Sequence, residues 1–448
     1  ATGHIAVCHS KKEDPVKTPR IRLATRGAAL AFALALGLSA CSSSGAPTEE
    51  NNTFTVWWFD TPDSAMGIAS AHALEEFKKA HPDVQVVFEQ KSFEQMQQTG
   101  TMVLNSDTAP DVMEFTKGSA TAGLAAKSGL LVDLTETAAK RGWNDLMPPS
   151  VAAVGHYDER GVLGLGPLYG IPNYGEFVSV YYNKDLFDQH GVKVPATMAE
   201  FEAAMDAFVA AGVTPLSVAG AEYGANHLWY QLALTKADRP WVNNFQLFEG
   251  DVDFHDEAWT FAAQTMLDWQ EKGYFSKDAT GLKATDMLTE FTTGQNPMMV
   301  SGTWFDGQLS AATDLNWSKF SFPGADYISG SGGNIWVVPE RSTQKELAEE
   351  FINFTLQPDA QMVLANAGAV AVAADPAQVT DPHAQESATM FAGIAESDGL
   401  AYYADWPAPG FYDFQVKSLQ SLLTGTLSVA QFNDAIAKFY QDYAAQIG

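Results

Sequence analysis

Short runs of β-forming residues alternate with helical patterns along the sequence after residue 52. The runs that predict strands are rich in valine or in aromatic residues and lie at 54–59, 84–88, 111–115, 178–182 and 213–218. Strands that alternate with helices of about ten to fifteen residues are typical of α/β folds with parallel sheets. The alternation therefore predicts an α/β protein.

Several helices are predicted from their apolar spacing and from their ends. Apolar residues at 66–77 recur at the spacing of a helix, and His81-Pro82 ends the pattern. Two pairs have the spacing of a capping box, which begins a helix: Ser92 with Gln95 and Thr197 with Glu200. A further helix is expected to end near Gly129, and the last helix is predicted at 429–445.

The composition excludes several classes of protein. The 448 residues include 26 Lys and Arg against 54 Asp and Glu, a formal charge of -28, whereas proteins that bind nucleic acid need clustered cations. Hydrophobic residues make up 46% of the chain, which is too much for a disordered protein. Two cysteines are too few for a disulfide framework or a thiolate metal cage. At this length more than one domain or lobe is expected.

The first 40 residues have the pattern of an export signal. Four Lys and Arg residues at 17–26 precede an uncharged apolar run at 27–37, and small residues continue to Ala40. The fourteen residues at 27–40 are fewer than the roughly 20 that a helix needs to span a bilayer. A buried core helix is the alternative interpretation of this run, and the basic residues before it favour the signal.

The junction Leu38-Ser39-Ala40-Cys41 resembles the bacterial lipobox, whose cysteine becomes the lipidated first residue of the mature protein. The polar stretch that follows Cys41 is typical of a flexible tether. We therefore expect a lipoprotein signal peptide at 1–40, lipidation at Cys41 and a tether at 41–52.

Motifs of catalytic and nucleotide-binding sites are absent from the sequence, which contains no G-x-S-x-G, Walker A, H-E-x-x-H or C-x-x-C pattern. The acidic run at 251–257 suggests calcium, but it lacks the loop glycine of an EF-hand, so we expect a solvated turn there. A glycosidase-like carboxylate pair stays open, because carboxylates are abundant, although no pair stands out. We expect no catalytic residue, no metal and no cofactor.

Aromatic residues gather near the predicted ends of strands and helices. Those at such ends are Trp57, Trp58, Tyr174, Trp229, Tyr230, Trp304, Trp336, Trp406, Phe411 and Tyr412. An aromatic ring offers a flat apolar face that matches the C–H face of a pyranose, and polar neighbours can bind the sugar's hydroxyl groups. Ligands of parallel-sheet domains bind beyond the carboxyl ends of the strands. Some of these rings are therefore candidates for a sugar site, and others are expected in the core.

Eight local patterns follow one another in a fixed order, at 55–58, 77–84, 105–112, 169–172, 181–187, 302–304, 332–339 and 349–352. Together, and behind a lipobox, they resemble the family 1 extracellular solute-binding proteins of bacterial ABC importers, the group that includes maltose-binding protein. The resemblance spans 53–446, and the stretch YYNKDLF at 181–187 is its most specific part.

The resemblance implies a two-lobe α/β fold of the periplasmic-binding-protein type (type II), in which parallel-sheet lobes are joined by a multi-segment hinge around a ligand cleft. Lobe 1 is expected to comprise 53–174 with 336–373, and lobe 2 to comprise 175–335 with 374–448. A monomer is expected.

The resemblance also implies ligand-binding positions on loops after strands and on the segments that cross between the lobes. These positions fall on Phe59, Asp60, Thr61, Thr116, Lys117, Glu176, His227, Trp229, Trp304, Asn334, Trp336 and Tyr412. The sequence departs from the family pattern at 368–372, where a G-x-x-P is common, and at Trp58-Phe59, where maltose-type binders have a polar residue. A different glycan or a different binding pose is therefore expected.

The implied function is that of a lipid-anchored, cell-surface binding component of a carbohydrate ABC importer. It would capture a mono- or oligosaccharide, close around it and dock on the permease subunits, without catalysis and without a nucleic-acid partner. Two alternatives remain at this point. The same fold would bind a cation such as a polyamine through Asp60, Glu114 and Glu176, or the chain would be an extracellular polysaccharide-active enzyme.

Overall fold

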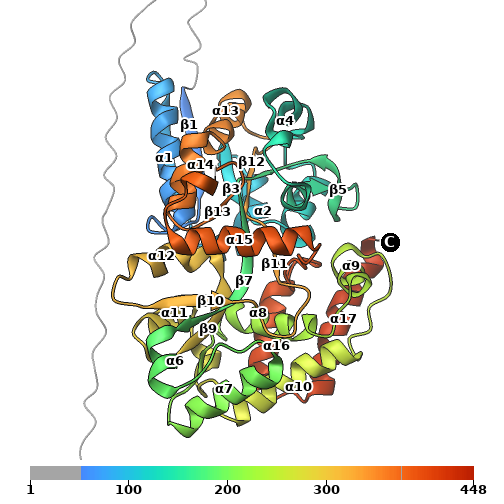
Figure 1. Ribbon diagram of the computed structural model, residues 1–448. Helices are drawn as coiled ribbons and strands as arrows, with labels where there is room; N and C mark the ends of the chain where they lie inside the picture. Colours follow the sequence, from blue (N-terminus) through green and yellow to red (C-terminus); the bar gives the residue numbers. More distant parts are fainter. Residues whose placement is uncertain (1–51, 375, 448) are drawn as a thin grey trace, which may run out of the picture. The chain divides into compact units, whose positions relative to one another are not determined.

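The computed structural model describes residues 52–374 and 376–447, which belong to one compact unit (Figure 1). Two β-sheets with helices packed around them make up this unit. The predicted signal peptide, Cys41 and the tether up to residue 51 lie outside the described residues. Within the described ranges, no helix is long and apolar enough to span a membrane.

The first sheet has the strand order β2-β1-β3-β12-β6. Its strands are β1 (Thr53–Trp58), β2 (Gln85–Gln90), β3 (Val112–Phe115), β6 (Ile171–Pro172) and β12 (Ile335–Val337). The helices around it are α1 (Ala65–Ala80), α2 (Phe93–Leu104), α3 (Leu124–Lys127), α4 (Thr135–Arg141), α5 (Pro149–Ala152), α13 (Lys345–Thr355) and α14 (Pro358–Asn366). A hairpin of β4 (His156–Tyr157) and β5 (Leu163–Leu168) completes this part.

The second sheet has the order β10-β7-β9-β8, with β11 and β13 also paired to β7. Its strands are β7 (Tyr174–Asn183), β8 (Leu216–Ser217), β9 (Met298–Gly302), β10 (Trp317–Phe320), β11 (Gly330–Gly332) and β13 (Val370–Ala371). The helices around it are α6 (Lys184–His190), α7 (Met198–Ala210), α8 (Tyr223–Leu234), α9 (Arg239–Leu247), α10 (Glu257–Glu271), α11 (Ala284–Thr292), α12 (Asp306–Ala311), α15 (Pro382–Glu396), α16 (Phe411–Leu423) and α17 (Val429–Ile447).

The chain passes between the two sheets three times. It leaves the first sheet at β6 and enters the second at β7, it returns from β11 to β12, and it reaches β7 again at β13 after α14 has packed on α1. Figure 1 shows α15 lying across the boundary between the two sheets. The predicted two-lobe α/β fold is confirmed by this arrangement.

The sheets are mixed rather than purely parallel, which differs from the prediction. In the first sheet β2 and β3 run parallel to β1, but β12 runs antiparallel to β3 and β6. In the second, only β8 and β9 are parallel, and β7 is antiparallel to all its partners. The antiparallel pairs involve the crossing segments, because a chain that comes from the other lobe runs through the sheet in the opposite direction.

Local signals in the sequence correctly marked several helix starts. Ser92 and Gln95 exchange capping-box hydrogen bonds of 3.0 and 3.2 Å at the start of α2. Thr197 and Glu200 exchange such bonds of 3.2 and 3.3 Å at the start of α7. The helix predicted to end near Gly129 is split into a π-helical turn at Ser119–Gly123 and the short α3. The capping boxes place α2 and α7 independently of tertiary contacts.

Candidate ligand-binding site

The loops after β1 and β3 lie next to each other, because these strands are parallel neighbours whose register pairs Trp57 with Met113. Lys117, in the loop after β3, reaches the centre of the protein. Its Nζ donates to Glu176 Oε1 at 2.5 Å and to Asn334 Oδ1 at 3.0 Å. Lys117 and Glu176 are both buried, with side chains 6% exposed. Lys117 therefore connects the loop after β3 of the first sheet to two of the crossing segments.

Asn334 is held in place by the hydroxyl of Tyr174. Its backbone N–H and its Nδ2 both donate to Tyr174 Oη at 3.1 Å, which turns Asn334 Oδ1 toward Lys117. Tyr174 is the first residue of β7, and Asn334 directly precedes β12. The hinge between the two sheets and the ion pair of Lys117 are therefore parts of one polar network.

Asp60 and Glu114 form a carboxyl pair beside this network. The two side chains are hydrogen-bonded to each other, and the backbone N–H of Phe59 donates to Glu114 Oε2 at 3.2 Å. Burial raises the pKa of both carboxyl groups, and the neighbouring charge of Asp60 raises that of Glu114 further. Such a pair holds a shared proton more tightly than two isolated carboxyls would.

Asp405 is a third carboxyl near Lys117, from the loop before α16. Burial raises the pKa of Asp405 to about 6, while the charge of Lys117 and a hydrogen bond with Gln97 act in the opposite direction. For a carboxyl with a usual pKa near 4, the folded state therefore binds the proton more tightly than the unfolded chain. The stabilisation from this proton is complete below about pH 4 and is lost as the pH rises through 6.

Asp405→Asn is accordingly expected to stabilise the protein by about 1–3 kcal/mol at pH 7 and to change little at pH 4, because asparagine resembles the protonated carboxyl at every pH. Urea unfolding of both proteins between pH 4 and 7.5 measures the difference. If the two proteins differ in unfolding free energy by the same amount from pH 4 to 7.5, the result would contradict the raised pKa of Asp405.

Five rings pack together next to Lys117 and form what we call the aromatic cluster: Tyr223, His227, Trp304, Tyr403 and Trp406. The ring centre of Trp304 lies 5.6 Å from that of Tyr223 and 5.4 Å from that of His227, and His227 lies 5.3 Å from Tyr403. Tyr403 and Trp406 are 5.2 Å apart, and Lys117 Nζ lies 5.5 and 5.7 Å from their ring centres. The cluster thus places aromatic faces around one buried cation.

Two glycines allow the tryptophans of the cluster to sit where they do. Gly302 ends β9, and a Cβ atom there would come within 1.9 Å of the indole of Trp304, which folds back over it. Gly118 has a φ of 103°, and a Cβ atom there would come within 2.6 Å of Trp406. Any larger residue at either position would displace a ring of the cluster.

Several buried polar atoms around the cluster have no hydrogen-bond partner within 52–374 and 376–447. They are Thr116 Oγ1, His227 Nδ1 and Tyr412 Oη. Burial, with Lys117 nearby, lowers the pKa of His227 to about 3, so its imidazole is neutral at physiological pH. Because buried polar groups are nearly always paired, these atoms mark a place where a polar ligand would supply the missing partners.

Phe93, the first residue of α2, links the two sides of the site. Its ring centre lies 5.7 Å from Phe59, 6.1 Å from Tyr223 and 6.2 Å from Tyr412, each in an edge-on geometry. Phe59 and Phe93 belong to the part around the first sheet, and Tyr223 and Tyr412 to the part around the second. The candidate site is therefore built from both lobes.

Most of the residues predicted from the sequence meet here. The structure brings together Phe59, Asp60, Thr116, Lys117, Glu176, His227, Trp304, Asn334 and Tyr412. Thr61 lies beside them at the surface, where its carbonyl accepts hydrogen bonds from Ser64 at the start of α1.

Trp229 and Trp336 lie apart from this group, in the cores of the lobes. Trp229 is fully buried, with its ring stacked on Trp259 at 4.9 Å and edge-on to Phe432 at 5.4 Å. Trp336 packs between Trp58 and Phe351. We leave both out of the candidate contact set, because both are buried, whereas Trp304 is only partly buried.

Sequence reasoning did not select Phe93, Tyr223, Tyr403 or Asp405 for the site. The segment around Tyr403 and Asp405 carries a signal in the sequence, since four residues of YYADW are aromatic or acidic. In the structure, Tyr402 of this segment adopts a positive φ of 59°. A φ of this kind is uncommon outside glycine and often marks a functional loop.

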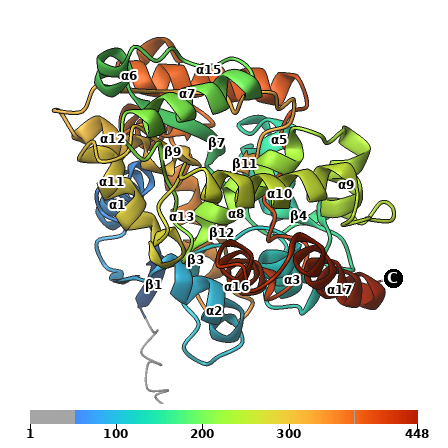
Figure 2. The same ribbon diagram turned by 90° about the horizontal axis from the view of Figure 1, so that it is seen from below.

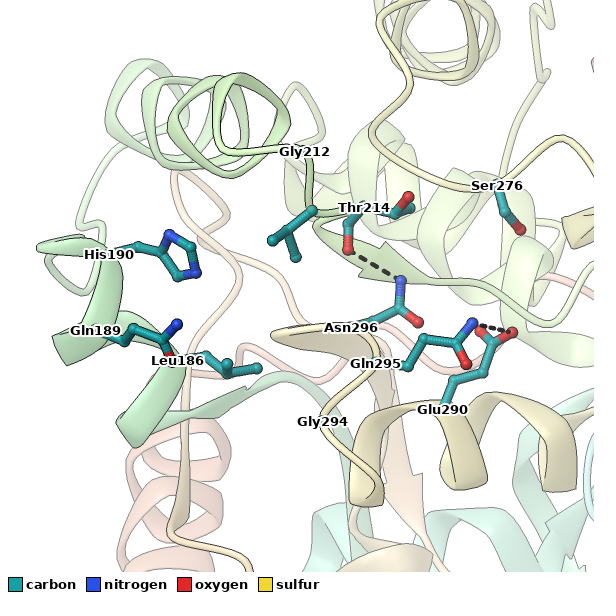
Figure 3. A pocket seen from close by; sticks show the side chains of 11 residues that line it. Leu186, Gln189, His190, Gly212, Thr214, Ser276, Glu290, Gly294, Gln295 and Asn296 are labelled. Atoms are coloured by element: carbon teal, nitrogen blue, oxygen red, sulfur yellow. Dashed lines mark hydrogen bonds between the residues drawn. The ribbon is translucent and has the colours of Figure 1, made fainter.

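A cavity of about 370 Å³ lies among α6, the loop at 212–214 and the segment 290–296, away from the candidate site (Figure 3). Asn296 Nδ2 donates to the carbonyl of Thr214 at 3.0 Å, and Gln295 Nε2 donates to Glu290 at 3.3 Å. None of the predicted site residues lines it.

In the acidic run at 251–257, Asp256 caps α10. No cluster of three or more potential metal ligands occurs among the described residues.

The description of the family model that matches the chain is "bacterial extracellular solute-binding protein", and the match covers residues 61–362. A lactose-binding protein of Rhizobium radiobacter is 26% identical over 339 residues, which cover 70% of this chain and 74% of the relative. A maltodextrin-binding protein of Bacillus subtilis is 24% identical over 72% of this chain and 73% of its own length. Among solved structures, a chitin oligosaccharide binding protein superposes with a TM-score of 0.76 at 20% identity, over 88% of this chain and 99% of that one.

Proposed function

Since the chain belongs to the bacterial extracellular solute-binding proteins, we propose that it captures a sugar for an ABC importer and releases it unchanged. The observation that carries this proposal is the set of unpartnered polar atoms around the aromatic cluster. Hydroxyl groups of a sugar both donate and accept hydrogen bonds, so they match Thr116, His227 and Tyr412 together. The relatives named for lactose and maltodextrin binding support the same class of ligand.

The proposed contacts divide between the two lobes, for which we propose the boundaries 53–174 with 336–373 and 175–335 with 374–448. Asp60, Thr116 and Lys117 would hydrogen-bond to the sugar from lobe 1, and charged partners make the stronger of these bonds. Trp304 and Tyr403 would supply apolar faces from lobe 2. Since a ligand makes both sets of contacts only when the lobes are together, it favours closure through its higher affinity for the closed form.

We propose further that the protein is held at the outer face of the cytoplasmic membrane by a lipid on Cys41, and that the closed form docks on permease subunits. Relatives described as maltooligosaccharide-binding lipoproteins support the anchor. Cys41→Ser is expected to move the protein from the membrane fraction to the soluble fraction of the cells that export it. Retention of the variant in the membrane fraction would contradict the lipid anchor.

Trp304→Ala tests the site directly and is expected to weaken sugar binding at least tenfold, because it removes a stacking face worth roughly 1.4 kcal/mol or more. A thermal-shift screen over mono- and oligosaccharides first identifies a ligand, since binding to the native state raises the melting temperature. Calorimetry with that sugar then compares the variant with the original protein.

Trp229→Ala is the matched control, because Trp229 has the same side chain but lies in the core. This variant is expected to lose about 3–5 kcal/mol of unfolding free energy, whereas apo Trp304→Ala should lose less, because Trp304 is only partly buried. If Trp304→Ala loses as much stability and still binds the sugar normally, Trp304 is a core residue and the proposed site is wrong.

A cationic solute such as a polyamine is the second candidate. It is favoured by Asp60, Glu114 and Asp405, which make no ion pair within the part of the chain that the structure describes. Against it, Lys117 occupies the middle of the site and would repel a cation. A polyamine panel in the same thermal-shift screen separates the two ligand classes.

A further inference from the structure

A groove of about 290 Å³ is lined by residues of both α2 and α16, two helices that Figure 2 shows from below. Its lining comes from α2, from the start of α8, from Lys283 and from α16. We call it the α2–α16 groove. Because α2 follows a strand of the first sheet and α16 packs on α8 beside the second, the groove is lined from both lobes. None of its lining residues except Tyr412 belongs to the site described above.

Tyr412 connects the groove to that site. Its ring lines the groove and meets Phe93, which in turn meets Tyr223 of the aromatic cluster. The hydroxyl of Tyr412 is buried and has no hydrogen-bond partner among the described residues. The groove thus has an apolar face with an unpaired polar group at its edge, which is the combination that a pyranose ring requires.

Three glutamines give the groove neutral hydrogen-bonding groups. Gln97 lies between the groove and the inner site, where its side chain bonds to Asp405, while its Oε1 is buried without a partner. Gln420 is fixed by a hydrogen bond of 2.8 Å from its Nε2 to the carbonyl of Thr280. Gln98 lies on the exposed side of α2. Amides both donate and accept, so they suit hydroxyl groups.

Charged residues of both signs line the groove, with three carboxyls from Glu94, Glu222 and Asp413 and two ammonium groups from Lys283 and Lys417. Glu94 of α2 lies near Glu222, which belongs to the part around the second sheet. Burial and the negative charge of Glu222 raise the pKa of Glu94. Lys283 lies 4.0 Å from Glu222, and Lys417 adds a second cation on α16. Because charges of both signs line the groove, it favours a neutral, hydroxyl-rich ligand over an ion.

We propose that the α2–α16 groove is a further sugar subsite, and that the ligand is an oligosaccharide whose chain runs from the aromatic cluster past Gln97 and Tyr412 into the groove. This inference rests on the proposed sugar-binding function and narrows it. A monosaccharide would occupy only the inner site, whereas each added unit in the groove contacts both lobes. Longer chains therefore bind more tightly.

The test compares affinities along homologous series of increasing length. The probes are glucose to maltotetraose and the matching N-acetylglucosamine, xylose and galactose series, measured by calorimetry. In the series that binds, the trisaccharide is expected to bind at least tenfold more tightly than the monosaccharide. A Gln98→Ala/Gln420→Ala variant is expected to lose most of this gain, about tenfold for two hydrogen bonds, and to bind the monosaccharide within twofold of the original protein.

Gln264→Ala is the control, since Gln264 is an exposed glutamine on α10, away from both sites. This substitution should change neither the affinity for the monosaccharide nor that for the trisaccharide. Equal affinities for mono- and trisaccharide in the original protein would overturn the second subsite. So would an equal loss for both sugars in the double variant, because the glutamines would then act through the inner site. Absence of binding in every series would instead contradict the sugar-binding function itself.

Discussion

Asp306→Ala is expected to lower the free energy of unfolding by about 3–5 kcal/mol, because it leaves the ammonium group of Lys319 buried without a counter-charge. Both side chains are fully buried, and Lys319 Nζ donates to Asp306 Oδ2 at 2.5 Å. Urea unfolding of the ligand-free protein measures this effect.

The expected effect is large because four elements share the same carboxylate. Tyr181 of β7 and Ser387 of α15 each donate to Asp306 at 2.6 Å, and Lys319 of β10 also donates to Ser387. Asp306 itself begins α12, two residues after Trp304. The network therefore joins the long crossing strand, the helix at the lobe boundary and the segment that carries Trp304.

Two variants control for this interpretation. Lys438→Met breaks an exposed ion pair with Asp442, and its cost should stay within about 0.5 kcal/mol. Asp306→Leu/Lys319→Met removes both buried charges and is expected to recover much of the stability lost in Asp306→Ala, since no unpaired charge remains. A double variant less stable than Asp306→Ala would show that the hydrogen bonds of Tyr181 and Ser387, rather than the charge, dominate.

Lys117→Met is expected to weaken sugar binding by about 100-fold or more. The substitution removes the cation at the centre of the candidate site and leaves the buried carboxylate of Glu176 without its partner. Truncating one member of a buried charged pair in a binding site typically costs about 2–5 kcal/mol, most of it as the penalty for the charge that remains. Calorimetry with the sugar found in the screen measures the loss.

The double variant Lys117→Met/Glu176→Gln separates binding from folding. It carries no unpaired charge at these positions, so its unfolding free energy should return toward the original value, while its affinity for the sugar stays low. A double variant that binds as well as the original protein would mean that neither side chain contacts the ligand. The ion pair would then only join the lobes.

Part of the site was predictable from the resemblance, which implied binding positions on loops after strands. In the structure β1 and β3 are parallel neighbours, so the loops that follow them place Asp60 close to Lys117. Residue type alone did not separate the stacking candidate Trp304 from Trp229, which is covered by Trp259 and Phe432. Trp229 is buried and Trp304 is only partly buried, and this difference is decided by the packing of elements that are distant in sequence.

The sequence by itself determined the α/β alternation and the starts of α2 and α7, because these depend on residues within a few positions of one another. Only the tertiary structure decided which carboxyl group Lys117 pairs with and which polar atoms are left without partners. Glu176 is 59 residues away from Lys117 along the chain, and Asn334 is 217 residues away. Such contacts exist only because three crossing segments bring the edges of two separate sheets together, and no local pattern encodes that meeting.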